Sequence, residues 1–311
     1  MIPYAFTLLL ACFVGILAQK TGLCMVRGVQ EFQAKRPGFL LTTLCCGFWL
    51  WLVSPISDQL FTDSALFRHS ISFPFFIGGL LFGLGSAMNK GCAISTISKL
   101  AKGHYQMIAT LLGWLIGWIL FAPVTLNMSY TTLAPITSPS ITVTVMLFLL
   151  IALIFFRVPS SKRPILLGVV LFGIIASLLT SLLPNWSPSE LFKDIAAASI
   201  HGEPDKWPSI QRYLVIVSLI IGMAISARKR LNFREFQLRP LQLVLHLCAG
   251  IIMGIGASLA LGGNDSQLFV ALPAFSPAAA LTVISMLVGT MAGIFIRKKL
   301  KYYLTDYLRN S

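Results

Sequence analysis

Long apolar runs dominate the pattern of hydrophobic and polar positions along this chain. Charges, prolines or Gly/Asn clusters separate the runs, and they lack the strict alternation that the strands of a membrane barrel require. Because lipid cannot satisfy backbone amides, each run is expected to form an α-helix. The runs are 3–19, 38–57, 73–89, 104–126, 140–156, 164–183, 212–227, 240–260 and 276–296.

The composition agrees with a chain built largely inside a membrane. Of its 311 residues, 56% are hydrophobic and only 11% are charged, and the mean hydropathy is +0.83. A crossing helix takes about 20 apolar residues, so this content is sufficient for roughly eight or nine helices and leaves little for an external domain. It excludes a soluble enzyme, a nucleic-acid-binding module and a disordered chain. The sequence therefore predicts an all-α integral membrane protein with about nine transmembrane helices.

The basic residues predict the orientation of the helices. The net charge is +14, and 20 of the 24 Lys and Arg residues follow odd-numbered runs. Because basic loops are retained on the cytoplasmic side, the N-terminus is expected outside and the C-terminus inside. The first run lacks a basic leader and is expected to be a retained helix rather than a signal peptide. The external segment 185–207 carries charges of both signs and is expected to contain a short surface helix.

A glycine-rich stretch occurs twice. From Gly78 the chain reads GGLLFGLGSAMNKGC, and from Gly250 it reads GIIMGIGASLALGGN. Small residues spaced four apart line one helix face and let two helix backbones approach closely. Packing alone would explain one copy, but the two copies lie in the third and eighth runs, which the charge pattern orients oppositely. The aligned glycines are Gly79, Gly83, Gly85 and Gly91 in the first copy and Gly250, Gly254, Gly256 and Gly262 in the second.

Oppositely oriented copies predict two inverted four-helix halves joined by the fifth run. Halves of this kind are typical of transporters, in which the substrate site usually lies at the repeat interface near the membrane midplane. The expected divisions are a first half (1–139), a linking helix with a cytoplasmic loop (140–163), an inverted second half (164–296) and a basic cytoplasmic tail (297–311).

Short, less apolar stretches follow the first, third and eighth runs. They read TGLCMVRGVQEF, GCAISTISKLAKG and GGNDSQLFVALPAF, and they are too brief to cross a membrane. We expect re-entrant helices over 22–33, 91–102 and 264–273 that start at the glycines. The unpaired backbone N–H groups of their first turns would point at a common cavity, and such a cavity favours anions.

Cys24 and Cys92 lie at the starts of two of these short helices, after Gly22 and Gly91. A thiol at a helix N-terminus is unusually reactive or polarizable. The alternative is that a free cysteine merely packs as a small hydrophobe, which we prefer for the cysteines inside apolar runs, Cys45, Cys46 and Cys248. The polar residues near Cys24 and Cys92 are Lys20, Arg27, Lys90, Ser95, Thr96 and Ser98.

GLC at Gly22 to Cys24, taken with FGLGSAMNKGCAIST at Phe82 to Thr96, resembles the YeeE/YedE sulphur transport family of bacterial inner-membrane proteins. The resemblance implies a permease of about nine helices with inverted halves that imports thiosulfate or a related small sulphur compound. It also implies that Cys24 and Cys92 match two cysteines that contact the substrate. The substrate-binding residues expected are Cys24, Cys92, Gly22, Gly91, Lys90, Ser95, Thr96, Gly263 and Asn264.

The chain departs from this family at the third cysteine. The segment reads GIGASLALGGNDS, so Gly263 or Asn264 stands where the family has a thiol. Asn264 retains hydrogen-bonding groups that could hold an oxyanion, but it cannot exchange thiols. Asp265 would repel an anionic substrate unless it caps a short helix or pairs with a cation.

Two classes of function remain open. In the first, the chain is a permease for a small sulphur-containing anion. In the second, it is a membrane sulphur-relay enzyme that carries persulfide on Cys24 and Cys92 to a soluble sulphurtransferase. The repeat favours the permease, so we expect no enzymatic activity. Nucleotide-binding and zinc-enzyme motifs are absent from the sequence, and no cofactor or metal is expected.

Overall fold

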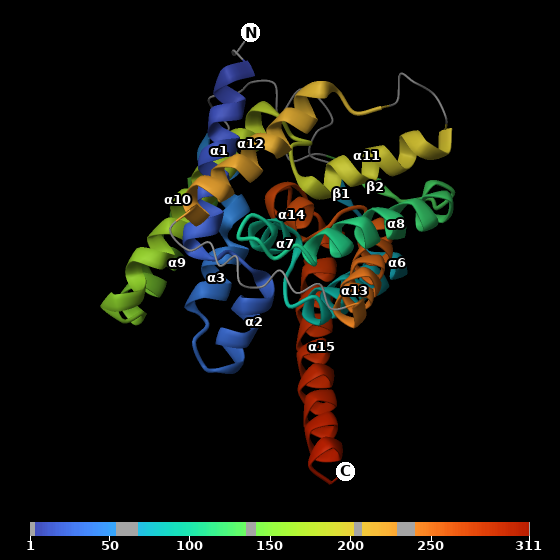
Figure 1. The fold of residues 1–311 in the computed structure, drawn as a ribbon. Helices are drawn as coiled ribbons and strands as arrows, with labels where there is room; N and C mark the ends of the chain where they lie inside the picture. The colour runs from blue at the N-terminus through green and yellow to red at the C-terminus, as the bar shows by residue number, and fades with distance from the viewer. Residues whose placement is uncertain (1–3, 54–67, 135–140, 202–206, 229–239, 311) are drawn as a thin grey trace.

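The computed structural model describes residues 4–53, 68–134, 141–201, 207–228 and 240–310. Within these ranges helices account for nearly all regular structure (Figure 1). The exception is a short antiparallel pair, β1 (Arg68–His69) and β2 (Thr132–Leu133), in which Arg68 is opposite Leu133 and His69 is opposite Thr132.

Long helices alternate with short ones along the described chain. The N-terminal part comprises α1 (Tyr4–Thr21), α2 (Met25–Gln33), α3 (Gly38–Leu44), η1 (Cys46–Trp49), α4 (Leu50–Val53), α6 (Phe73–Met88), α7 (Ala93–Leu100) and α8 (Met107–Leu126). The rest comprises α9 (Ile141–Arg157), η3 (Ser160–Lys162), α10 (Arg163–Leu182), α11 (Pro188–His201), α12 (Ile210–Ala227), α13 (Pro240–Leu259), α14 (Asn264–Ser266), the π-turn η7 (Gln267–Ala271) and α15 (Pro277–Asn310).

The lengths and hydropathy of these helices identify a multi-pass membrane protein. Within the described residues there are 6 candidate spans, namely Tyr4–Gln33, Met107–Leu126, Ser160–Leu182, Ile210–Ala227, Pro240–Leu259 and Pro277–Lys299, and a shorter apolar helix, Val145–Arg157. The first candidate joins α1 to the short helix α2, and α6 has 16 residues. The nine crossings expected from the sequence therefore stay a prediction.

The expectation of one continuous helix over 38–57 is wrong for its described part. The chain there breaks into α3, η1 and α4. Gly47 lies at the break, where a Cβ would overlap the backbone carbonyl of Leu268 in η7 and would lie 2.7 Å from Pro273. The 3-10 turn η1 interrupts the α-helix where η7 packs directly against it, and this contact is invisible in the hydropathy of the segment.

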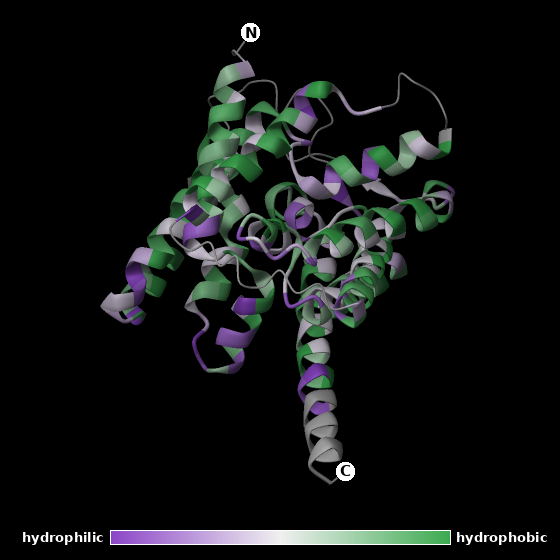
Figure 2. Ribbon diagram, viewed as in Figure 1, coloured by the Kyte–Doolittle hydropathy of each residue, from purple (hydrophilic) through white to green (hydrophobic). Residues whose placement is uncertain are grey.

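Two groups of long helices surround the short ones. Helices α1, α10 and α12 pack together on one side, and α6, α8, α13 and α15 on the other. The short helices α7 and α14 lie between the groups (Figure 1). Buried side chains fill both groups, represented by Val14 and Leu219 in the first and by Trp114 and Met253 in the second. Figure 2 shows that hydrophobic residues predominate along the long helices, whereas hydrophilic residues gather in connections and on the short helices.

Glycines bring helix backbones into contact at two equivalent places. Gly83 on α6 faces α15, where an added Cβ would overlap the carbonyl oxygen of Met286. Gly254 on α13 faces α8 and would overlap the carbonyl of Trp114. The small-residue faces predicted from the sequence therefore do let backbones approach closely. In α6 the glycines of the first copy contact α15, and in α13 the glycines of the second copy contact α8.

Candidate functional site

The short helices α2, α7 and α14 begin in the same way. Each follows a residue with positive φ that ends the preceding long helix, and the next residue but one is the N-cap. Backbone hydrogen bonds close these turns, from Gly91 to Ser86 at 2.9 Å and from Gly262 to Ala257 at 2.8 Å. The pairs of positive-φ residue and N-cap are Gly22 (φ 62) with Cys24, Lys90 (φ 61) with Cys92 and Leu261 (φ 55) with Gly263.

Gly263 rather than Asn264 occupies the place that corresponds to Cys92. Both are N-caps with almost the same backbone conformation, φ −83 and ψ −174 at Cys92 against φ −78 and ψ −172 at Gly263. A Cβ at Gly263 would overlap the hydroxyl of Ser189 and lie 2.8 Å from Oδ1 of Asp265. Those two side chains take up the space that a thiol would need.

The starts of the three short helices meet at a small cavity of about 10 Å³. A water molecule needs about 10 to 15 Å³, so the cavity has room for about one water molecule. It is lined by Cys24, Cys92 and Asn264 together with Leu23, Met25, Thr43, Ile94, Leu268 and Phe269. Three residues proposed from the sequence thus come together, although they are far apart in the chain.

The thiols of Cys24 and Cys92 interact directly, and both are free. The Cys92 sulphur accepts a hydrogen bond from the Ser95 hydroxyl at 3.6 Å, and the backbone N–H of Met25 lies near it. The backbone N–H of Arg27, in the first turn of α2, lies near the Cys24 sulphur. Weak donors therefore surround two polarizable sulphur atoms in a buried place.

Asn264 lines the same small cavity as the two thiols. Its side chain is 4% exposed, and its Oδ1 accepts the N–H of Ala93 at 3.4 Å. The side chain of Asn264 therefore links the N-terminus of α7 to that of α14.

The described residues contain no cluster of three His, Cys, Asp or Glu side chains that could hold a metal ion.

Ser95 and Thr96 are buried beside Cys92. Their hydroxyls donate to the Cys92 carbonyl at 3.1 and 2.8 Å, and Thr96 also accepts the side-chain amide of Asn89 at 2.7 Å. Lys90, by contrast, has an exposed side chain, and its carbonyl accepts the ammonium of Lys99 at 2.7 Å.

The predicted glycines lie beside the thiols in the chain but contribute through their backbones. Gly22 adopts the positive φ that ends α1, and its carbonyl accepts Nη1 of Arg27 at 3.4 Å. At Gly91 a Cβ would lie 2.8 Å from the Ser95 hydroxyl. Neither these glycines nor Lys90, Ser95 and Thr96 line the small cavity.

A fourth short helix, α11, is the helix that the sequence analysis expected in 185–207. Its placement at the surface is wrong, because Ser187 and Ser189 at its start are buried and Ala196 and Ala198 are fully covered. Ser187 caps the helix by accepting the N–H of Glu190 at 3.4 Å. Serine three residues before glutamate, with proline between, is a recognisable helix start.

Asp265 joins α11 to α14. Its carboxylate accepts the N–H of Ser189 at 3.0 Å and the hydroxyl of the same residue. The side chain is completely buried. The sequence analysis left open a cap on the short helix that contains Asp265 or a pairing with a cation; these contacts instead make Asp265 a cap on the first turn of α11.

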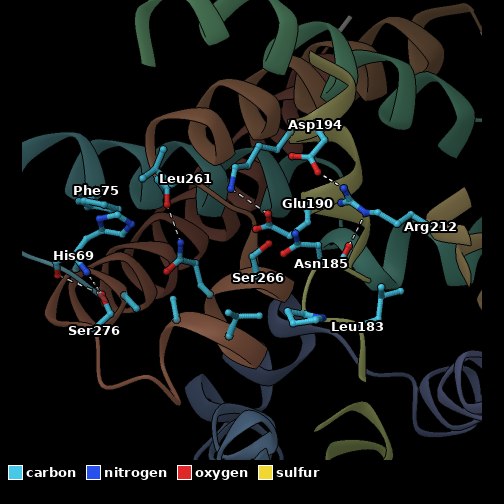
Figure 3. A pocket seen from close by; sticks show the side chains of 18 residues that line it. His69, Phe75, Leu183, Asn185, Glu190, Asp194, Arg212, Leu261, Ser266 and Ser276 are labelled. Atoms are coloured by element: carbon cyan, nitrogen blue, oxygen red, sulfur yellow. Dashed lines mark hydrogen bonds and ion pairs between the residues drawn. The ribbon is translucent and has the colours of Figure 1, made fainter. Parts of the chain in front are cut away.

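A larger cavity of about 440 Å³ is lined by residues of α11, α12, α14 and η7 (Figure 3). Its charges are paired, Lys193 with Glu190 at 3.1 Å and Arg212 with Asp194. Burial and the charge of Lys193 lower the pKa of His69 at its edge, which favours the neutral imidazole. The lining also includes Ser266 and Gln267, which follow Asn264 and Asp265 directly, and Asn185, Leu261 and Ser276.

Comparison with known proteins identifies the family. A model described as sulphur transport matches the chain over residues 20–166 and again over residues 139–292. The two matched segments overlap around α9, and together they extend from residue 20 to residue 292 of the 311. The resemblance stated from the sequence is thereby confirmed. No curated protein matches the chain.

Proposed function

The chain belongs to the sulphur transport family, and on that premise we propose that it is a bacterial inner-membrane permease for thiosulfate or a related small sulphur-containing anion. The observation that carries the proposal is the cavity at which Cys24, Cys92 and Asn264 meet. Backbone N–H groups, hydroxyls and thiols converge there inside a multi-pass membrane protein. Such weak donors suit a soft anion that must bind and also leave.

The substrate would enter through the larger cavity beside α11. The cations and carboxylates that line this cavity form two ion pairs and balance each other in charge. An anion would therefore be neither held tightly there nor repelled by a net negative charge. From Ser266 it would pass Asn264 and reach the thiols, with Ser95 and Thr96 holding the first turn of α7. The proposed binding set is the one given from the sequence, in which Lys90 and the glycines act through the backbone turns.

The loss of the third thiol is compatible with non-covalent permeation. Gly263 removes the side chain at the N-cap, and Asn264 provides an amide at the next position. A neutral hydrogen bond contributes about 1 kcal/mol net, so exchanging one weak donor for another costs little. Cys24 and Cys92 would act as protonated donors, because a pair of thiolates would repel the incoming anion.

We further propose that residues 1–139 and 164–296 are inverted halves joined by α9, with the N-terminus outside and the basic C-terminus cytoplasmic. Two features support this arrangement. The contact of α6 with α15 has its counterpart in that of α13 with α8, as inversion of the repeat requires. The family model also matches twice, once for each half.

A sulphur relay is the second candidate, and the contact between the Cys24 and Cys92 thiols favours it. In that mechanism the thiolate of one cysteine would take the outer sulphur of thiosulfate and release sulfite. The resulting persulfide would pass its sulphur to the other thiolate and then to a soluble sulphurtransferase. The relay needs exchange-competent thiols but no net transport of the anion.

Uptake of labelled thiosulfate into liposomes that contain only this protein tests the proposal. We expect uptake by the wild type and by the Cys248→Ala control, whose cysteine is exposed on α13, and a severe loss in Cys92→Ala. The protein recovered after uptake should carry no added sulphur. Sulfite release without uptake, with a persulfide on Cys24 or Cys92, would establish the relay instead.

A further inference from the structure

A second large cavity, of about 670 Å³, lies between the α2–α3 connection, the end of α9 and the start of α10. It shares no lining residue with the cysteine cavity or with the cavity beside α11. Nothing in the proposed transport path uses it. Its basic lining residues are Arg27, Lys35, Arg36, Arg157 and Lys162.

The charge of this cavity is strongly unbalanced. Among the described residues that line it, the five basic side chains face one acidic side chain, Glu31, which leaves a charge of +4. Glu31 binds Arg27 at 2.9 Å and lies 3.9 Å from Lys162. Arg36 and Arg157 are exposed and form no ion pair within the described part of the chain. The cavity beside α11, in contrast, has equal numbers of ion-paired cations and carboxylates.

The wall of the cavity on the side of α9 is apolar. Leu41, Leu150 and Leu153 line it and are 37%, 40% and 54% exposed, and Ile154 is buried behind them. The apolar surface continues along α9 to Phe156, which is 82% exposed. In a membrane protein such a surface faces acyl chains. The basic rim and the lipid-facing wall thus belong to one continuous hollow.

We infer that this cavity binds an anionic phospholipid. Its phosphate would lie among Arg36, Arg157 and Lys162, and its acyl chains would lie along the leucines of α3 and α9. Basic pockets between membrane helices on the cytoplasmic side recognise such headgroups. A small inorganic anion would leave the leucine wall uncovered, and a zwitterionic lipid would leave the excess positive charge unmatched.

The bound lipid has a structural role. Helix α9 packs mainly against α3 and η1, and most of its surface is exposed. A lipid in the cavity would connect the end of α9 to the start of α10 and to the α2–α3 connection. It would therefore hold the linking helix against the N-terminal helices.

Thermal unfolding of the purified full-length protein tests this inference, with added phosphatidylglycerol compared with phosphatidylcholine. The variant replaces Arg36, Arg157 and Lys162 by Gln. A matched control replaces Lys20, Lys102 and Lys298, which do not line the cavity, by Gln. We expect phosphatidylglycerol to raise the unfolding temperature of the wild type and the control but not of the variant. Apparent affinity should fall about fivefold for each cavity cation removed.

Native mass spectrometry provides a second readout, in which phosphatidylglycerol should stay bound to the wild type and the control and be lost from the variant. Soluble glycerol phosphate should give no stabilisation, because it lacks acyl chains. Equal losses in the variant and the control would mean a general surface attraction and would overturn the inference. An equal stabilisation by glycerol phosphate or by phosphatidylcholine would overturn it as well. None of these outcomes depends on whether thiosulfate is transported.

Discussion

Gly263 is the position at which the smallest perturbation should have a large effect. It is the N-cap of α14, at the place that Cys92 occupies in α7. An added Cβ would overlap the Ser189 hydroxyl and lie 2.8 Å from Oδ1 of Asp265, against an ordinary contact of at least 3.4 Å. Gly263→Ala therefore requires a shift of about 0.6 Å at the carboxylate, since buried groups keep normal contact distances.

The free-energy cost of Gly263→Ala depends on which neighbouring groups must move to admit the Cβ. Overpacking a well-filled site costs about 1 to 3 kcal/mol. Rotating the Ser189 hydroxyl away relieves the overlap but breaks its bond to a buried carboxylate, and a hydrogen bond to a charged group contributes about 1.5 to 3 kcal/mol. Where both costs apply, we expect Gly263→Ala to lower the free energy of unfolding by about 2.5 to 6 kcal/mol.

Urea unfolding in detergent micelles, followed by tryptophan fluorescence, measures this change. Combining Gly263→Ala with Ser189→Gly removes the overlap and keeps the Ser189 N–H that binds Asp265, so the second substitution should recover part of the loss. Gly91→Ala is the control, because its Cβ would meet the Ser95 hydroxyl, whose acceptors are neutral. Equal costs for Gly263→Ala with and without Ser189→Gly, or a cost no greater than that of Gly91→Ala, would refute the reasoning.

Three further results are expected. Cys92→Ala should reduce thiosulfate uptake at least tenfold, which corresponds to about 1.4 kcal/mol in free energy, at unchanged expression. Cys45→Ala should leave uptake nearly unchanged, and equal losses in the two variants would mean that both cysteines only pack. Mild oxidation should form a disulfide between Cys24 and Cys92, because their thiols interact, and uptake should stop until a reductant is added. Mass analysis after alkylation would detect the disulfide, and its absence would contradict the contact between the thiols. Asn264→Ser should retain uptake and Asn264→Asp should lose it, since a second buried carboxylate repels the anion, and the opposite order would exclude an anion path there.

Hydropathy alone located most of the long helices. The runs 104–126, 164–183 and 212–227 correspond closely to α8, α10 and α12, because a helix in lipid must be apolar over its whole length. The run 38–57 was wrong as a single helix, since the bend at Gly47 depends on contact with η7, more than two hundred residues further along the chain. Such contacts leave no local signal.

The candidate site was partly predictable. Glycine followed by cysteine at a polar, non-crossing stretch was enough to select Cys24 and Cys92. The resemblance to the family added Asn264, near the place of a third cysteine, and the three residues line one cavity. The helix α11 was expected from the sequence, but its buried position was not, because its charges of both signs and its prolines are typical of an exposed segment. The serine and glutamate at its start were a usable signal, but Asp265 as the partner of Ser189 comes only from the tertiary structure.

The glycine contacts between helices also limit how the protein can open. At Gly78 a Cβ would lie 2.7 Å from the carbonyl oxygen of Gly256, so α6 and α13 touch backbone to backbone with no side chain between them. Helix α6 belongs to the first proposed inverted half and α13 to the second, so a rocking motion of one half against the other would shear this contact, which has no flexible side chains to absorb the displacement. We therefore expect the pathway to open by local movement. Side-chain movements at Leu268 and Phe269 would widen the small cavity while the helices packed through their glycines keep their positions.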